Sequence, residues 1–159
     1  MNSALSSARQ EYVQWFIEKP FSFWVTLTFR QSTKSIQSVD RYLKKLNHTL
    51  RRRAFGKHAL SKDKFNNSEF ISMVAMIEEC VDGSFHVHAL ITHPPKILKP
   101  KNEFSLAEAV IMEWQKITGS SDNKIDPLLA KSDIRYTSFY MLKTYKQYPE
   151  RQYLFCWDA

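Results

Sequence analysis

Cysteine is scarce in this sequence of 159 residues, and it has no apolar run long enough to cross a membrane. The two cysteines, Cys80 and Cys156, form no paired-Cys motif and are too few for a disulfide framework. The N-terminal segment, with Arg9, Gln10 and Glu11, lacks the apolar core of a signal peptide. These absences exclude disulfide-rich secreted proteins and membrane proteins. We therefore expect a soluble cytoplasmic protein that does not act at a membrane, with one domain over residues 1–159.

Acidic residues are scarce in one segment of the chain. Between Lys34 and Lys64, ten Lys or Arg residues are accompanied by only two acidic ones, whereas the net charge of the whole chain is +7. So unbalanced a cluster indicates a polyanionic partner, because its charges are not neutralised locally. The predicted contacts to nucleic-acid phosphates are Arg41, Lys44, Lys45, Arg51, Arg52, Arg53 and Lys57.

Two histidines lie one residue apart in the apolar segment that follows. Side chains on a strand alternate between its faces, so His86 and His88 should point to the same side of a sheet. The preceding Asp82-Gly83 pair predicts a tight turn, which would pair residues 73–79 with residues 85–92 as a hairpin. Two imidazoles and a carboxylate on one face predict a site for a divalent metal ion with open coordination positions.

The identity of that carboxylate depends on the turn. A two-residue loop would pair Glu79 with His86, whereas a three-residue loop with a bulged glycine would pair Glu78 with His86. The alternation of the strands is compatible with both registers.

The order of predicted elements indicates an α+β fold. Strands and helices do not alternate strictly, as a parallel sheet would require, so we expect a mainly antiparallel sheet of RRM or ferredoxin-like type with helices packed on it. One face of the sheet should be free for a ligand, with Thr26, Thr28, His86 and His88 on it. The expected helices are 6–17, 35–53, 105–118 and 132–147, and the expected strands are 23–29, 73–79, 85–92, 124–126 and 152–157.

The last predicted helix carries a second set of chemically useful residues. Tyr136, Tyr140 and Lys143 are spaced so that they form one stripe. A tyrosine one turn from a lysine, above a sheet that binds a metal ion, has the parts of a nucleophile for phosphoryl chemistry.

Three segments in order resemble the HUH endonucleases. Residues 24–29 are similar to the first motif of this superfamily, His86-Val87-His88 to its metal motif, and Tyr140-Met141-Leu142-Lys143 to its nucleophile helix. Their order and spacing resemble those of rolling-circle replication initiators, over about residues 24–146. Two-tyrosine members carry a tyrosine directly after the lysine, where this chain has Thr144. We therefore expect one essential tyrosine, Tyr140, with Tyr136 as the candidate for a second.

The resemblance implies a five-stranded antiparallel sheet and a metal-dependent enzyme that nicks and rejoins single-stranded DNA through a 5′-phosphotyrosine. It also implies that Glu78 is the third metal ligand beside His86 and His88, that Glu79 points away, and that the ion is Mn²⁺ or Mg²⁺. The expected partners are an origin or hairpin nick site in single-stranded DNA, with host helicase and replication proteins as further candidates. Two alternatives remain open: a single-tyrosine transposase or relaxase, and a non-enzymatic RRM-like nucleic-acid binder.

Overall fold

A computed structural model describes residues 2–56, 73–92, 105–143 and 152–157. The elements in chain order are α1 (Asn2–Glu18), β1 (Phe23–Leu27), α2 (Ile36–Phe55), β2 (Met73–Glu79), β3 (Phe85–Ile91), α3 (Leu106–Thr118), β4 (Lys124–Pro127), α4 (Lys131–Met141) and β5 (Gln152–Trp157). None of the described helices is long and apolar enough to cross a membrane. The predicted loops over 57–68 and 94–101, which include Lys57, lie outside the described residues.

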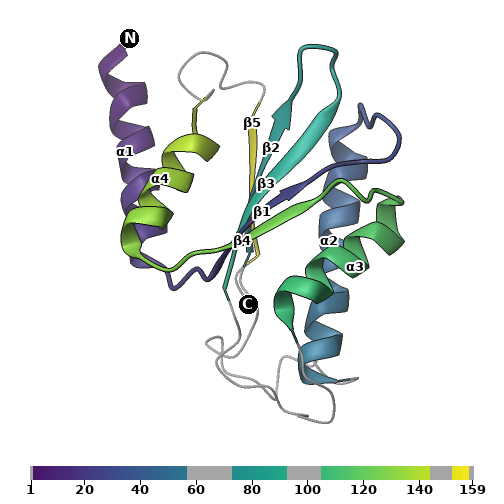
Figure 1. Cartoon of the computed structure of the whole chain (residues 1–159). Coiled ribbons are helices and arrows are strands. Elements are labelled where there is room, and N and C mark those ends of the chain that lie inside the picture. The colour runs from purple at the N-terminus through teal and green to yellow at the C-terminus, as the bar shows by residue number, and fades with distance from the viewer. Residues whose placement is uncertain (1, 57–72, 93–104, 144–151, 158–159) are drawn as a thin grey trace.

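The strands form one sheet of five in the order β4-β1-β3-β2-β5, and every neighbouring pair is antiparallel (Figure 1). The elements from β1 to β4 follow the order β-α-β-β-α-β, which is the split βαβ arrangement. The predicted α+β class and the antiparallel sheet are thereby confirmed.

Helices α2 and α3 cover one face of the sheet (Figure 1). The apolar side chains of α2 recur at helical spacing, and four of them are fully buried: Val39, Leu43, Leu46 and Leu50. They pack with the inward residues of β1, β2 and β3, such as Leu27, Ile77 and Val87. The two helices are also joined by charge, because Arg53 on α2 donates to the Glu113 carboxylate on α3 (2.7 Å). The pKa of Glu113 is lowered, chiefly by a hydrogen bond from Lys116 and further by Arg53.

Helices α1 and α4 cover part of the opposite face, which we had expected to be free. Phe16 of α1 and Met141 of α4 pack against Val74, Met76 and Leu90 from the sheet, and these five side chains are almost fully buried. The continuous apolar run at the start of β2 is the local signal for this, because a strand covered on both sides loses its polar alternation. Only the end of this face near the β2–β3 turn and β4 remains accessible, and the polar residues gather there.

Helix α4 is shorter than the sequence indicated. It begins at Lys131 rather than at Ser132 or Asp133, because the Asp133 carboxylate folds back and accepts from the amides of Leu129 (3.0 Å) and Ala130 (2.9 Å). It ends at Met141 instead of continuing to Gln147, and residues from Thr144 to Arg151 lie outside the described part of the chain. Tyr140 therefore stands in the last turn of the helix, with Lys143 just beyond its end.

Candidate metal and nucleophile site

The turn between β2 and β3 decides which glutamate faces the histidines. The Cys80 amide donates to the Ser84 carbonyl (2.7 Å), which leaves a loop of three residues that ends at Gly83. Gly83 has a φ of +77°, a conformation that favours glycine and produces the bulge of a three-residue loop. Glu78 consequently lies opposite His86, and Glu79 lies opposite Phe85. Of the two registers compatible with the sequence, the structure has the one that brings Glu78 to the histidines.

Glu78, His86 and His88 converge through three ligand atoms. Glu78 Oε2 lies 3.2 Å from His86 Nε2 and 3.5 Å from His88 Nε2. The two Nε2 atoms lie 3.1 Å apart. Ligands bound about 2.1 Å from one ion would be roughly 3.0 to 3.4 Å apart at right or tetrahedral angles. These three residues therefore form a group that could hold a metal ion.

A buried oxygen without a hydrogen bond supports the same conclusion. Glu78 is buried, and within the described residues its Oε2 atom has no hydrogen-bond partner of good geometry. An unsatisfied buried carboxylate oxygen is costly unless a cation is its intended neighbour. Two imidazoles with one carboxylate, leaving open positions, is a donor set that divalent transition metals accept.

Residues behind the histidines fix the orientation of both rings. Thr26, directly opposite His88 on β1, has its hydroxyl 3.2 Å from His88 Nδ1. Cys80 has its thiol 3.2 Å from His86 Nδ1. With each Nδ1 engaged in this way, each Nε2 is left to face Glu78. Thr26 was predicted on this face, whereas the contact of Cys80 was missed, although Cys80 lies two residues after Glu78 and so falls on the same side of the chain.

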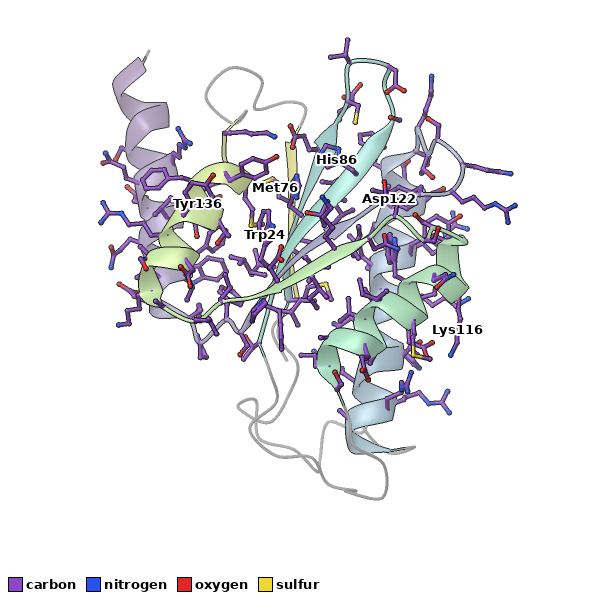
Figure 2. The ribbon with its side chains drawn as sticks, in the orientation of Figure 1. Trp24, Met76, His86, Lys116, Asp122 and Tyr136 are labelled. Carbon is purple, nitrogen blue, oxygen red and sulfur yellow. The ribbon has the colours of Figure 1, made fainter. Side chains whose placement is uncertain are left out.

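Trp24 is the other residue of the site that the sequence analysis did not identify. Its ring stacks on the His88 imidazole, with centroids 5.0 Å apart and planes at 10°. It lies two residues before Thr26 on β1, so strand alternation alone could have placed it on this face. Figure 2 shows Trp24 and Met76 on the side of the sheet that α4 covers.

The protonation states at this cluster suit a metal ion. Burial lowers the pKa of His88, even though its interaction with Glu78 works in the opposite direction. For Glu78, burial alone would raise the pKa, but hydrogen bonds with both histidines and the charge of Lys143 hold it well below its ordinary value. A charged carboxylate and a neutral imidazole at neutral pH are the forms that bind metal ions.

Tyr140 and Lys143 meet this cluster from α4. The Tyr140 ring lies edge-on to His88 (centroids 5.3 Å apart) and edge-on to Trp24 (5.9 Å). Lys143 Nζ lies 4.1 Å from the centroid of the Tyr140 ring and 3.5 Å from Glu78 Oε2. Burial alone would lower the pKa of Lys143, but the Tyr140 side chain and the Glu78 charge outweigh it and raise the pKa. The structure thus brings the predicted tyrosine and its lysine to the predicted metal ligands.

Helix α1 holds the end of α4 that carries Tyr140. Arg9 Nη2 donates to the carbonyl oxygen of Phe139 (2.8 Å), and the Arg9 guanidinium lies over the Phe139 ring (5.4 Å to the centroid). The Lys143 amide bonds to Tyr140 O instead of continuing the helical pattern to Phe139 O. Arg9 therefore satisfies a carbonyl that the end of the helix leaves open, at a terminus where positive charge is favourable.

Tyr136 lies one turn earlier and is not in contact with the triad. Its side chain is 74% exposed, and in the part of the chain that the structure describes it has no hydrogen bond, ion pair or ring contact. It lines a cleft of about 380 Å³ that opens beside His88 and Tyr140. Figure 2 shows Tyr136 on α4 and Asp122 near the end of β4.

The predicted phosphate contacts lie elsewhere. Those within the described residues are on α2, which packs on the opposite face of the sheet from Glu78 and the histidines. Lys44 pairs with Asp40 (2.7 Å) and Arg53 pairs with Glu113, while burial lowers the pKa of Arg51. The remaining described members, Arg41, Lys45 and Arg52, are exposed. The structure does not bring this basic set to the metal cluster.

Comparison with known proteins adds one finding. A family model of replication-associated proteins, described by its ORF2 type, matches residues 22–145, well over half of the chain. The chain belongs to this replication-associated protein family. The matched segment includes every residue of the cluster from Trp24 to Lys143, whereas α1 lies outside it. No curated protein and no solved structure matches the chain.

Proposed function

We propose that this protein is an HUH-type endonuclease that nicks and rejoins single-stranded DNA and thereby initiates rolling-circle replication of a plasmid or phage. The observation that carries the proposal is the convergence of Tyr140 and Lys143, from one helix, on Glu78, His86 and His88, from a hairpin remote in sequence. Membership of a replication-associated family supports the initiator role over that of a transposase or relaxase.

The residues have distinct tasks in this reaction. The Tyr140 oxygen attacks the scissile phosphorus, the bond from phosphorus to the 3′ oxygen breaks, and that oxygen leaves as a free 3′-OH. The 5′ end stays joined to Tyr140 until the 3′-OH attacks the same phosphorus and restores the strand. Lys143 offsets the negative charge that develops during each attack. A divalent ion held by the triad, Mn²⁺ or Mg²⁺, would polarise a phosphoryl oxygen.

A phenol needs this assistance. Its ordinary pKa of about 10 makes it a weak nucleophile at neutral pH. Lys143 contacts both Tyr140 and the Glu78 carboxylate, so it can stabilise phenolate character without adding an unpaired charge to the site.

The test is a search for the covalent adduct. Random-sequence single-stranded DNA is incubated with the protein and Mn²⁺, denatured, and resolved by gel electrophoresis, and the attached fragments are sequenced. The wild type should form an adduct, and Tyr140→Phe, which removes only the attacking oxygen, should form none while still binding DNA. The matched control is Tyr136→Phe, which should form adduct normally. If Tyr140→Phe forms adduct and Tyr136→Phe does not, the nucleophile is Tyr136 and the assignment is wrong.

A non-enzymatic RRM-like binder is the second candidate from a different class. Such proteins stack bases on aromatic residues of their central strands. Here Phe23 and Phe85 pack into the core under α2 and α3, and Trp24 is engaged with His88. Binding without any adduct in the assay above would favour this candidate.

A further inference from the structure

The cleft beside the triad offers surfaces that the cleavage reaction does not use. At about 380 Å³ it lies at the lower end of the range for small-molecule sites. Trp24, Tyr136 and Tyr140 form aromatic walls, and Asp122 and Lys124 add polar groups. Trp24 and Tyr140 are already in ring contacts around His88, so the free aromatic face is that of Tyr136.

A rigid segment presents Asp122 to the cleft. The Thr28 hydroxyl donates to the Asp122 carbonyl oxygen (2.6 Å) and is hydrogen-bonded to the Ser120 hydroxyl (2.6 Å). The Asn123 side chain accepts from the Thr28 amide (3.0 Å) and donates to the Ser120 carbonyl (2.8 Å). The connection between α3 and β4 is therefore fastened to the end of β1, which fixes the position of Asp122 relative to the triad.

The polar groups at this end of the cleft are uncommitted. Asp122 and Lys124 are both exposed, and among the described residues neither side chain has a hydrogen bond or an ion pair. An aromatic ring without partners beside an uncommitted carboxylate and an ammonium group is the combination that single-stranded nucleic-acid sites use. Bases stack on the ring, and their edges bond to the polar groups.

We propose that this cleft binds one unpaired guanine nucleotide next to the scissile phosphate, with Tyr136 stacking on the base and the Asp122 carboxylate accepting from its edge. The proposal rests on the proposed nicking function, since it places the base by the position of Tyr140. It assigns Tyr136 a binding role that depends on its ring and not on its hydroxyl.

The choice of guanine follows from donor and acceptor patterns. Guanine presents two adjacent N–H donors on its Watson–Crick edge, which match the two oxygens of a carboxylate. Adenine and cytosine present an amino group beside a ring nitrogen that accepts, and that lone pair would repel the second oxygen of Asp122. Thymine presents one N–H between two carbonyl oxygens. Lys124 offsets the repulsion between Asp122 and the DNA phosphates.

The test measures binding without chemistry. Fluorescein-labelled decathymidylate is compared with the same strand carrying one guanine, adenine, cytosine or abasic site at its centre, by anisotropy titration in EDTA. The guanine strand should bind about tenfold more tightly than the others. Asp122→Asn, whose amide matches adenine better than guanine, should shift the preference to the adenine strand. Asp122→Ala should abolish the preference.

Two controls separate this proposal from the proposed function. Asp126→Asn changes an exposed carboxylate on the same strand that does not line the cleft, so it should keep the guanine preference. Tyr136→Ala should weaken binding to all strands about tenfold, whereas Tyr136→Phe should bind as the wild type does. Equal affinity of the wild type for all the strands, or an unchanged preference in Asp122→Asn, would overturn the base site. The adduct assay judges nicking independently.

Discussion

The hydrogen bond between Thr26 and His88 should control metal affinity, and Thr26→Val is the change that isolates it. Valine keeps the branched shape and the strand preference of threonine but lacks the hydroxyl. With His88 Nε2 directed at Glu78, the proton of the neutral ring is on Nδ1 and is donated to Thr26. Removing the acceptor leaves that N–H buried and frees the ring to turn or to exchange tautomers.

The size of the effect follows from burial. The His88 side chain is only 5% exposed, so water cannot replace the lost partner. An unsatisfied buried donor costs about 1–3 kcal/mol, and loss of such an orienting contact typically lowers metal affinity 10- to 100-fold. We expect Thr26→Val to bind Mn²⁺ about tenfold more weakly and to unfold about 1 kcal/mol more easily. Cys80→Ala should cost less, because a thiol is a weak acceptor and the His86 side chain is 25% exposed.

Isothermal titration with Mn²⁺ measures the affinity, and urea denaturation without metal measures the stability. Thr26→Ser, which retains the hydroxyl, is the matched control and should bind nearly as tightly as the wild type. The reasoning is refuted if Thr26→Val binds Mn²⁺ as the wild type does, or if Cys80→Ala costs more affinity than Thr26→Val.

Three further changes test other parts of the structure. Lys143→Ala should slow adduct formation roughly 10- to 100-fold in single-turnover assays without abolishing it, and Lys143→Arg should retain most of the rate; full activity in the alanine variant would remove Lys143 from the mechanism. Replacing Arg41 and Lys45 by alanine should weaken binding of every single strand and reduce the log-log salt slope by about 0.7 per lost phosphate contact, whereas an unchanged slope would mean that DNA does not reach α2. Glu113→Gln should lower the free energy of unfolding by about 1 kcal/mol at pH 7. Because the folded-state pKa of Glu113 is depressed, this difference should vanish as the pH falls through that pKa, and a loss that persists unchanged in acid would contradict it.

The parts of the site that the sequence predicted are those that local periodicity determines. The alternation that places His86 and His88 together, and the helical spacing of Tyr140 and Lys143, follow from strand and helix geometry alone. The choice between Glu78 and Glu79 does not, because both registers preserve the same alternation. The hydrogen bond between Cys80 and Ser84, with Gly83 in its left-handed conformation, decides it.

The remaining features depend on how distant elements pack. The basic cluster is dense in sequence, but sequence density does not say which face of the sheet its helix covers, and α2 lies away from the triad. The cover provided by α1 and α4 was missed, since the open face was inferred from polar residues at one end of the sheet. The contact between Lys143 and Glu78 joins residues 65 positions apart, and only the packing of α4 creates it.

The bond from Arg9 to the Phe139 carbonyl makes the N-terminal helix part of the reaction machinery. Helix α1 lies outside the residues that define the family, yet it grips the nucleophile helix one residue before Tyr140. A domain trimmed to the family boundaries would keep every reacting group while losing the brace that aims one of them. Fusion partners or tags placed on α1 would press on the same lever, so the length and attachment of this helix belong among the variables of any engineered form.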